Sequence, residues 1–214
     1  MPENNEVFKS YFKDKTVAIV GNAESVFEKN DGQFIDSHDI VIRMTRTGIF
    51  YDRPNCVESL GKKIDVWAFW DLVLLNPQGI IGNKRVSPMR DKLAQYHKNG
   101  GTYKILDIKN RGNNRKRVGF IFDDLEVFKE EKLKGFFGIS NPSTGLLVMK
   151  LVSLANPSQV NVFGFDWKKT PSQGEPYFHK YTVNGIDKRN GHDFNKEKKY
   201  AFDNYLNRDN WSLY

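Results

Sequence analysis

The feature that most constrains the fold is a short apolar run near the N-terminus, Val17–Val20, which ends at Gly21-Asn22. An unbroken run of β-branched and small apolar residues is typical of a strand buried on both faces, as in a parallel sheet. Comparable runs recur at 39–44, 62–70 and 103–108. The sequence therefore predicts an α/β fold built on a largely parallel central sheet.

Helical segments alternate with these runs. An apolar stretch over 146–155 has no internal breaker and predicts a helix, which feeds a strand predicted over 159–165. Helical spacing also predicts helices over 125–133 and 193–206. We expect helices on both faces of the sheet.

Composition excludes several classes of protein. The chain has 214 residues, 39% of them apolar, which is enough to bury a core. No run approaches the ~18 apolar residues of a membrane span, so we expect a soluble cytoplasmic protein. One cysteine, Cys56, excludes an internal disulfide and a thiolate metal cluster. Without a linker to divide the chain, we expect an N-terminal arm (1–14) and one domain (15–214).

The net charge of +7 is concentrated in two segments. Residues 104–117 contain six basic residues and one acidic residue, and residues 168–199 contain eight basic and four acidic residues. Basic segments suit an anionic small molecule and nucleic acid alike, and charge alone does not distinguish the two. A solvated loop explains residues 104–117 equally well.

Gly21-Asn22 is the first candidate site. Ligands of open α/β sheets bind at the carboxyl ends of the strands, where a glycine lets a ligand approach the backbone. An asparagine amide there can both donate and accept. A simple strand-ending turn is the alternative. No GxGxxG or GxxxxGK[ST] sequence follows, which excludes the usual dinucleotide and P-loop sites.

Ser143, Thr144 and Gly145 form the second candidate site, at the start of the predicted helix. Hydroxyl residues at this position cap helices. The same arrangement is an anion site, because it offers free backbone N–H groups and the positive end of the helix dipole. We interpret Gly145 as removing a Cβ that would crowd a phosphate or a ribose.

The third candidate is His192, which lies within the second basic segment at the start of the helix predicted over 193–206. A histidine can act as a general base near neutral pH, although an isolated surface histidine is often inert. Tyr177 and His179 precede it, and Glu197 could fold back toward it. The sequence contains no HxxxH, HExxH or Asp-x-Asp set, so we expect no metal ion.

Taken in order, these segments resemble the eukaryotic-type sialyltransferase family, which is defined by large, small, third and very-small sialylmotifs. Residues 17–46 (VAIVGNAES…GQFIDSHDIVIRMTR) resemble the large motif, and residues 141–167 (NPSTGLLVMKLVSLANPSQVNVFGFDW) resemble the small motif. His192 and Glu197 match the His-x4-Glu pattern of the very-small motif. The resemblance implies a GT-A-like fold with a single Rossmann-type sheet and no metal requirement.

The resemblance also implies roles for the donor site. Asn22, beside Gly21, would contact the nucleotide of a CMP-linked sugar. Ser143, Thr144 and Gly145 would hold its ribose and phosphate.

The same resemblance assigns catalysis to His192, the base that would deprotonate the acceptor hydroxyl. His179 would support the departing phosphate, with Tyr177 as the alternative, and Glu197 and Arg43 would have supporting roles. The family's Arg-Met-Asn is Arg-Met-Thr here, so the hydroxyl of Thr45 would replace a donor-contacting amide. The family's disulfide cannot form in a chain with one cysteine.

The expected function is that of a sialyltransferase. It would move sialic acid, or another CMP-linked sugar, from the CMP-sugar co-substrate to a glycan acceptor by metal-independent inverting displacement. One alternative is a protein that binds a nucleotide sugar without transferring it, and another is a basic nucleic-acid-binding domain that uses residues 104–117. We expect no nucleic-acid partner, no membrane segment and no cofactor. The sequence leaves the acceptor, the linkage and the oligomeric state open.

Overall fold

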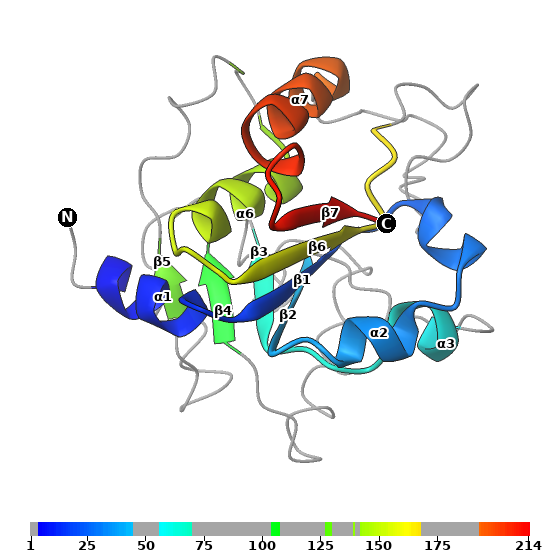
Figure 1. The fold of residues 1–214 in the computed structure, drawn as a ribbon, viewed down its shortest axis with the longest axis horizontal. Coiled ribbons are helices and arrows are strands. Elements are labelled where there is room, and N and C mark those ends of the chain that lie inside the picture. Colours follow the sequence, from blue (N-terminus) through cyan, green and yellow to red (C-terminus); the bar gives the residue numbers. More distant parts are fainter. Residues whose placement is uncertain are drawn as a thin grey trace, which may run out of the picture.

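In the part of the chain that the structure describes, seven parallel strands form one sheet, in the order β5-β4-β3-β2-β1-β6-β7 (Figure 1). The computed structural model describes residues 4–44, 56–69, 104–107, 127–129, 139, 142–167 and 193–214. Within these ranges the strands are β1 Thr16–Val20, β2 Ile40–Met44, β3 Val66–Phe69, β4 Lys104–Asp107, β5 Val127–Lys129, β6 Gln159–Phe163 and β7 Trp211–Leu213.

Helices cover both faces of the sheet (Figure 1). They are α1 Asn4–Phe12, the 3₁₀ helix η1 Glu24–Glu28, α2 Gly32–Asp36, α3 Cys56–Leu60, α6 Thr144–Ser153, α7 Phe194–Ala201 and the π-helical segment η6 Phe202–Leu206.

The alternation of side chains along β1 explains why helices pack on both faces of the sheet. Successive side chains of a strand point to opposite faces. Val17 and Ile19 are fully buried in the cluster that contains α1, α6 and α7, whereas Ala18 and Val20 pack with η1, α2 and α3. Because both sets of side chains are apolar, β1 can be central only in a sheet that is covered on both sides.

The strand order contains a switch point beside β1. The chain leaves β1 to build β2 and β3 on one side, and later returns through α6 to place β6 on the other side. Connections therefore diverge from the carboxyl ends of β1 and β6, which is where ligands bind in open α/β sheets. The fold places the ends of these two strands, Gly21-Asn22 and Gly164-Phe165, at this point.

The expected α/β fold with a parallel sheet flanked by helices is confirmed. The helix predicted over 125–133 is wrong at its centre, because Val127–Lys129 is strand β5 and pairs with β4. Valine and phenylalanine favour strands, and pairing outweighed the helical spacing. Strand β7 was not predicted, because its three residues are too few to show alternation. The N-terminal arm is helical over α1, and its Phe8 and Phe12 are buried in the core; the division at residue 15 stays a prediction.

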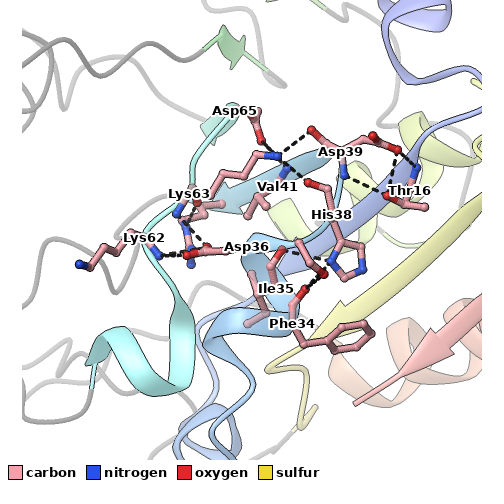
Figure 2. A network of polar contacts seen from close by, with 12 residues as sticks. Thr16, Phe34, Ile35, Asp36, His38, Asp39, Val41, Lys62, Lys63 and Asp65 are labelled. Carbon is pink, nitrogen blue, oxygen red and sulfur yellow. Dashed lines mark hydrogen bonds and ion pairs between the residues drawn. The ribbon is translucent and has the colours of Figure 1, made fainter.

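Polar contacts join the amino ends of β1, β2 and β3 (Figure 2). The Asp36 carboxylate accepts from the backbone N–H groups of Lys62 and Lys63, at 2.8–3.0 Å. The Lys63 ammonium donates to the carbonyls of His38 and Asp39, at 2.5 and 2.9 Å. These contacts hold the chain segment before β2 against the segment before β3.

Two more carboxylates complete this amino-edge network. Asp39 accepts from the N–H and the hydroxyl of Thr16, at 2.9 and 3.0 Å, and the Thr16 hydroxyl accepts from the Asp39 N–H. These bonds, led by the backbone bond from Thr16, hold the pKa of the Asp39 carboxyl below its usual value. Asp65 accepts from the Val41 N–H at 2.8 Å, and burial raises the pKa of its carboxyl.

Candidate functional site

The two glycine-containing motifs meet at one aromatic ring. A Cβ atom added to Gly21 would come within 2.9 Å of the Phe165 ring, and a Cβ added to Gly145 would overlap the same ring. Phe165 therefore lies between the end of β1 and the start of α6. The structure thus brings together two candidate motifs that are far apart in the sequence.

This geometry gives the glycines a different reason from the one expected. The sequence suggests that Gly145 leaves room for a phosphate or a ribose. In the structure, however, the ring of Phe165 occupies the space that a Cβ of residue 145 would fill. A Cβ on Gly21 would overlap the Gly164 carbonyl oxygen first and then contact the Phe165 ring, and the Gly21 N–H donates to the Phe163 carbonyl at 2.7 Å. Gly164 has a φ of +67°, a conformation that favours glycine, and its carbonyl accepts from the Ala23 N–H.

Asn22 ties the ends of two strands together. Its amide nitrogen donates to the Met44 carbonyl at 3.2 Å, which links the end of β1 to the end of β2. The side chain is only half-buried, and its amide oxygen accepts no hydrogen bond from the residues that the structure describes. One polar atom of Asn22 is thus used by the fold, and the other is available to a ligand.

Ser143 caps α6, as the hydroxyl motif predicted. Its side-chain oxygen accepts from the Leu146 N–H at 3.3 Å. Its backbone N–H donates to Glu197 Oε1 at 2.9 Å, and its hydroxyl donates to Glu197 Oε2 at 2.5 Å. Both donor groups of Ser143 are therefore directed at one carboxylate.

Glu197 joins two helix N-termini. It lies in the first turn of α7, is fully buried, and contacts the first turn of α6, 54 residues earlier in the chain. The predicted approach of Glu197 to His192, at the start of its own helix, stays a prediction because His192 lies outside the described residues. That start is capped by Asp193, which accepts from the Lys196 N–H at 3.2 Å, a bond that keeps the pKa of the Asp193 carboxyl below its usual value.

Two N–H groups at the start of α6 have no partner in the described parts of the chain. They belong to Thr144 and Gly145, which follow the capping serine. The first N–H groups of a helix have no partner within the helix itself and carry its positive dipole end. This pair of donors can bind an anion.

Ser25 and Asp166 were not predicted as site residues. The Asp166 carboxylate accepts from the hydroxyl and, at 3.4 Å, from the N–H of Ser25, which ties the loop after β6 to the start of η1. The sequence signal that could have identified this pair is a polar residue in the segment that follows each of two strands, β1 and β6. Because these residues are 141 positions apart, only the order of the strands brings them together.

Arg43, expected as a supporting residue, is fully buried on the α3 face of β2. Its guanidinium donates to the carbonyls of Lys63 and Leu60, at 2.8 and 2.7 Å, and lies 3.8 Å from the Asp36 carboxylate. Arg43 therefore connects β2 to the end of α3 and to the amino-edge network.

Four expected site residues lie outside the described residues, and their roles stay predictions; they are Thr45, Tyr177, His179 and His192. In the ranges that the structure describes, no three His, Cys, Asp or Glu side chains are grouped so that they could hold a metal ion. No helix in the same ranges has the length and apolar character to cross a membrane.

The sequence matches no family model and, at a significant level, no curated protein. The structure is similar to crystal structures of a mammalian sialyltransferase. One, in complex with Gal-beta-1-3GalNAc-ortho-nitrophenol, gives a TM-score of 0.54 at 15% identity and covers 96% of this chain and 71% of its own. Another gives a TM-score of 0.56 at 13% identity, over 99% of this chain and 78% of its own. At this identity the match shows the fold alone, and the chain has the α/β fold of these sialyltransferases.

Proposed function

We propose that this protein is a glycosyltransferase that takes a CMP-linked sugar, with CMP-sialic acid as the first donor to test. The observation that carries the proposal is the meeting of three motifs at the carboxyl ends of β1 and β6. Asn22 ends β1, Ser143 opens α6, and Glu197 of α7 binds Ser143 directly. In a fold shared with sialyltransferases, these are the segments that resemble the large, small and very-small motifs.

The donor phosphate would bind at the start of α6. The N–H groups of Thr144 and Gly145 supply two donors at the positive end of the helix dipole, and the Thr144 hydroxyl supplies a third. These donors also stabilise the charge that develops on the phosphate as it leaves. No metal ion is needed for this step. The half-buried amide of Asn22 would contact the nucleoside.

The reaction we propose is a single in-line displacement at the anomeric carbon, with inversion. His192 removes the proton of an acceptor hydroxyl, and that oxygen forms the new glycosidic bond. The bond between the anomeric carbon and the phosphate oxygen breaks, and CMP leaves with the electron pair. His179, or else Tyr177, would stabilise that phosphate. Each acid–base contribution is typically worth ~10²–10⁴ in rate.

The acceptor is proposed as a glycan ending in galactose or N-acetylgalactosamine. The support is indirect, since one of the similar structures holds a Gal-beta-1-3GalNAc glycoside. A short panel of such glycosides is therefore the first set of acceptors to test.

The test combines binding with transfer. Thermal unfolding is measured with CMP, UMP, GMP and AMP, because a ligand at ~100 times its dissociation constant adds ~2.7 kcal/mol to the free energy of unfolding. Transfer is then measured as CMP release and product formation from CMP-sialic acid, with and without EDTA. We expect CMP to stabilise the protein most, and transfer to survive EDTA.

Three results would count against the proposal. Stabilisation by CMP without transfer to any acceptor indicates a nucleotide-sugar-binding protein. Loss of transfer in EDTA with recovery in Mn²⁺ contradicts the metal-independent mechanism. No response to any nucleotide, together with salt-dependent binding of oligonucleotides, indicates a nucleic-acid-binding domain.

A further inference from the structure

Trp167, the fourth residue after β6, has a backbone conformation that bulky residues seldom adopt. Its φ is +48°, in the left-handed region. The other described non-glycine residues with a positive φ are Asp14 and Asn156, whose short polar side chains tolerate this region. The sialylmotif resemblance assigns Trp167 no role. Because the conformation is unfavourable for tryptophan, the ring supplies something at this place that a glycine would not.

Trp167 lies in a row of three half-buried aromatic rings. Its ring centroid is 5.6 Å from that of Phe165 and 6.0 Å from that of Phe202, the first residue of η6. Phe165 in turn packs at the first turn of α6, where its ring fills the space beside Gly145. The row therefore leads from the start of α6 to η6, and two ring contacts hold the indole in place.

These contacts leave part of the indole available to a ligand. The Trp167 side chain is only half-buried, and its Nε1–H donates to none of the residues that the structure describes. Buried tryptophan N–H groups usually have a hydrogen-bond partner. An aromatic face beside an available N–H donor suits a molecule that presents C–H groups and hydroxyl oxygens side by side. The ring of a sugar has this combination.

The position of Trp167 distinguishes the acceptor from the donor nucleotide. Asn22, the proposed nucleoside contact, bonds to the Met44 carbonyl and so lies on the β2 side of β1. Trp167 contacts Phe202 of η6, which packs on β7, at the other side of the switch point. In an in-line displacement the acceptor oxygen attacks the anomeric carbon from the side opposite to the departing phosphate. A ring on the β7 side is therefore placed for the acceptor.

Asp166, the neighbour of Trp167, indicates that the sugar is neutral. Its carboxylate accepts from the hydroxyl and the N–H of Ser25, which fix its position. A ligand phosphate or carboxylate at this place would be repelled by the like charge, which disfavours both the CMP and the sialic acid of the proposed donor. A sugar hydroxyl, in contrast, can donate to a carboxylate.

We propose that Trp167 binds the acceptor, with its indole stacked on the apolar face of a neutral hexose and its Nε1–H donated to a hydroxyl oxygen of that sugar. The inference rests on the proposed function and names the residue that selects its acceptor. In galactose the axial 4-hydroxyl leaves the C–H groups at C3, C4 and C5 on one face, whereas in glucose the C4–H points to the other face. Trp167 therefore favours galactosides over glucosides.

The first experiment follows the indole N–H signals of the full chain in a ¹H–¹⁵N spectrum. The chain has four tryptophans, and the signal of Trp167 is the one that is absent from Trp167→Phe. CMP is added to saturation, and methyl β-galactoside is then titrated into the same sample. We expect the Trp167 signal to shift mainly in the second step. A signal that shifts only with CMP, or with neither ligand, would overturn the inference.

The second experiment measures the dissociation constants of the galactoside and of CMP for two variants. Trp167→Gly removes the ring and relieves the positive φ, whereas Trp167→Phe keeps a ring without the N–H. We expect the galactoside to bind about tenfold more weakly to Trp167→Gly and about threefold more weakly to Trp167→Phe, with the affinity for CMP unchanged. A purely structural role of the indole would weaken both ligands by the same factor, and that result contradicts the proposal.

Phe34→Leu and methyl β-glucoside are the matched controls. Phe34 is a partly exposed aromatic residue on the other face of the sheet, where it contacts Phe163. Its substitution should leave the affinity for the galactoside within about twofold of the wild type. The glucoside should bind more weakly than the galactoside to the wild type, and the two should bind equally to Trp167→Gly. Equal binding of the two sugars by the wild type contradicts the proposed stacking.

The results separate the inference from the proposed function. Absence of binding of both CMP and the galactoside refutes both. Binding of CMP with no contact of the galactoside at Trp167 refutes the inference alone. Binding of the galactoside at Trp167 without binding of CMP supports the inference and refutes the nucleotide part of the proposed function.

Discussion

The two edges of the sheet use similar polar residues in different ways. At the amino edge, Asp36, Asp39 and Lys63 are all directed at backbone groups of neighbouring segments (Figure 2). At the carboxyl edge Glu197 also accepts from backbone, but the N–H groups of Thr144 and Gly145 have no partner in the described ranges. We infer that the amino edge stabilises the fold and that the carboxyl edge keeps donors available for a ligand. Substitutions at the two edges should therefore have different effects.

The largest effect is expected for His192→Ala. If His192 is the base, turnover should fall by ~10²-fold or more, because acid–base catalysis contributes that much. The affinity for CMP should change little, since the base contacts the acceptor and not the nucleotide. Steady-state kinetics and calorimetry measure the two quantities. Turnover within a few-fold of the wild type would remove this assignment, and His179 would then be the residue to test.

Gly145→Ala should lower stability. The added Cβ overlaps the Phe165 ring, so we expect the free energy of unfolding to fall by about 1–3 kcal/mol, as for other overpacked sites. Phe165→Leu in the same chain should recover part of this loss, which urea unfolding of the two single variants and the double variant would measure. Additive losses would show that the ring is not what Gly145 accommodates.

Asp36→Asn should lower stability and leave CMP affinity unchanged. The amide replaces one acceptor oxygen by a donor that faces the N–H groups of Lys62 and Lys63, which costs about 1 kcal/mol. Glu58→Gln, an exposed change on α3, is the control and should stay within about 0.5 kcal/mol of the wild type. Weaker CMP binding by Asp36→Asn would mean that the two edges are coupled.

The smallest effect concerns pH. The pKa of Asp39 is lowered, mainly by the bond from the Thr16 N–H, so its stabilisation is present above about pH 4 and is lost as pH falls through the folded-state pKa. The pKa of Asp65 is raised by burial, so the stability that its carboxyl contributes is present at low pH and is lost as the pH rises. In urea unfolding between pH 5 and 3, Asp39→Asn should flatten the acid loss of stability. Asp209→Asn, which removes the same charge at an exposed position, is the control and should leave the acid loss of stability as it is in the wild type.

The fold could be predicted from the sequence where one element carries its own signal. The runs around Val17–Val20 and over 159–165 contain the strands β1 and β6 (Gln159–Phe163), most of whose side chains are buried on both faces. Segments whose structure depends on a neighbour were missed: β5 and β7 are three-residue strands formed by pairing.

The candidate site divides in the same way. The hydroxyl motif predicted the Ser143 cap, which is local. The contact of Ser143 with Glu197, and the ring of Phe165 between two glycines, were not predicted. Both join residues from separate elements, and their positions follow from strand order and not from spacing along the chain.

The place of β1 between β2 and β6 has a consequence for how the chain is made. Thr16 of β1 pairs with Gln159 of β6, and the Ser25–Asp166 contact spans 141 residues. At synthesis rates of ~5–20 residues per second, one side of β1, an interior strand of the sheet, waits roughly 7–30 s for its partner β6. During that time its open backbone groups can pair with another nascent chain. An interior strand of the sheet is therefore paired on its second side only late in synthesis. The interval before β6 emerges is when the chain is most exposed to aggregation and has most need of a chaperone.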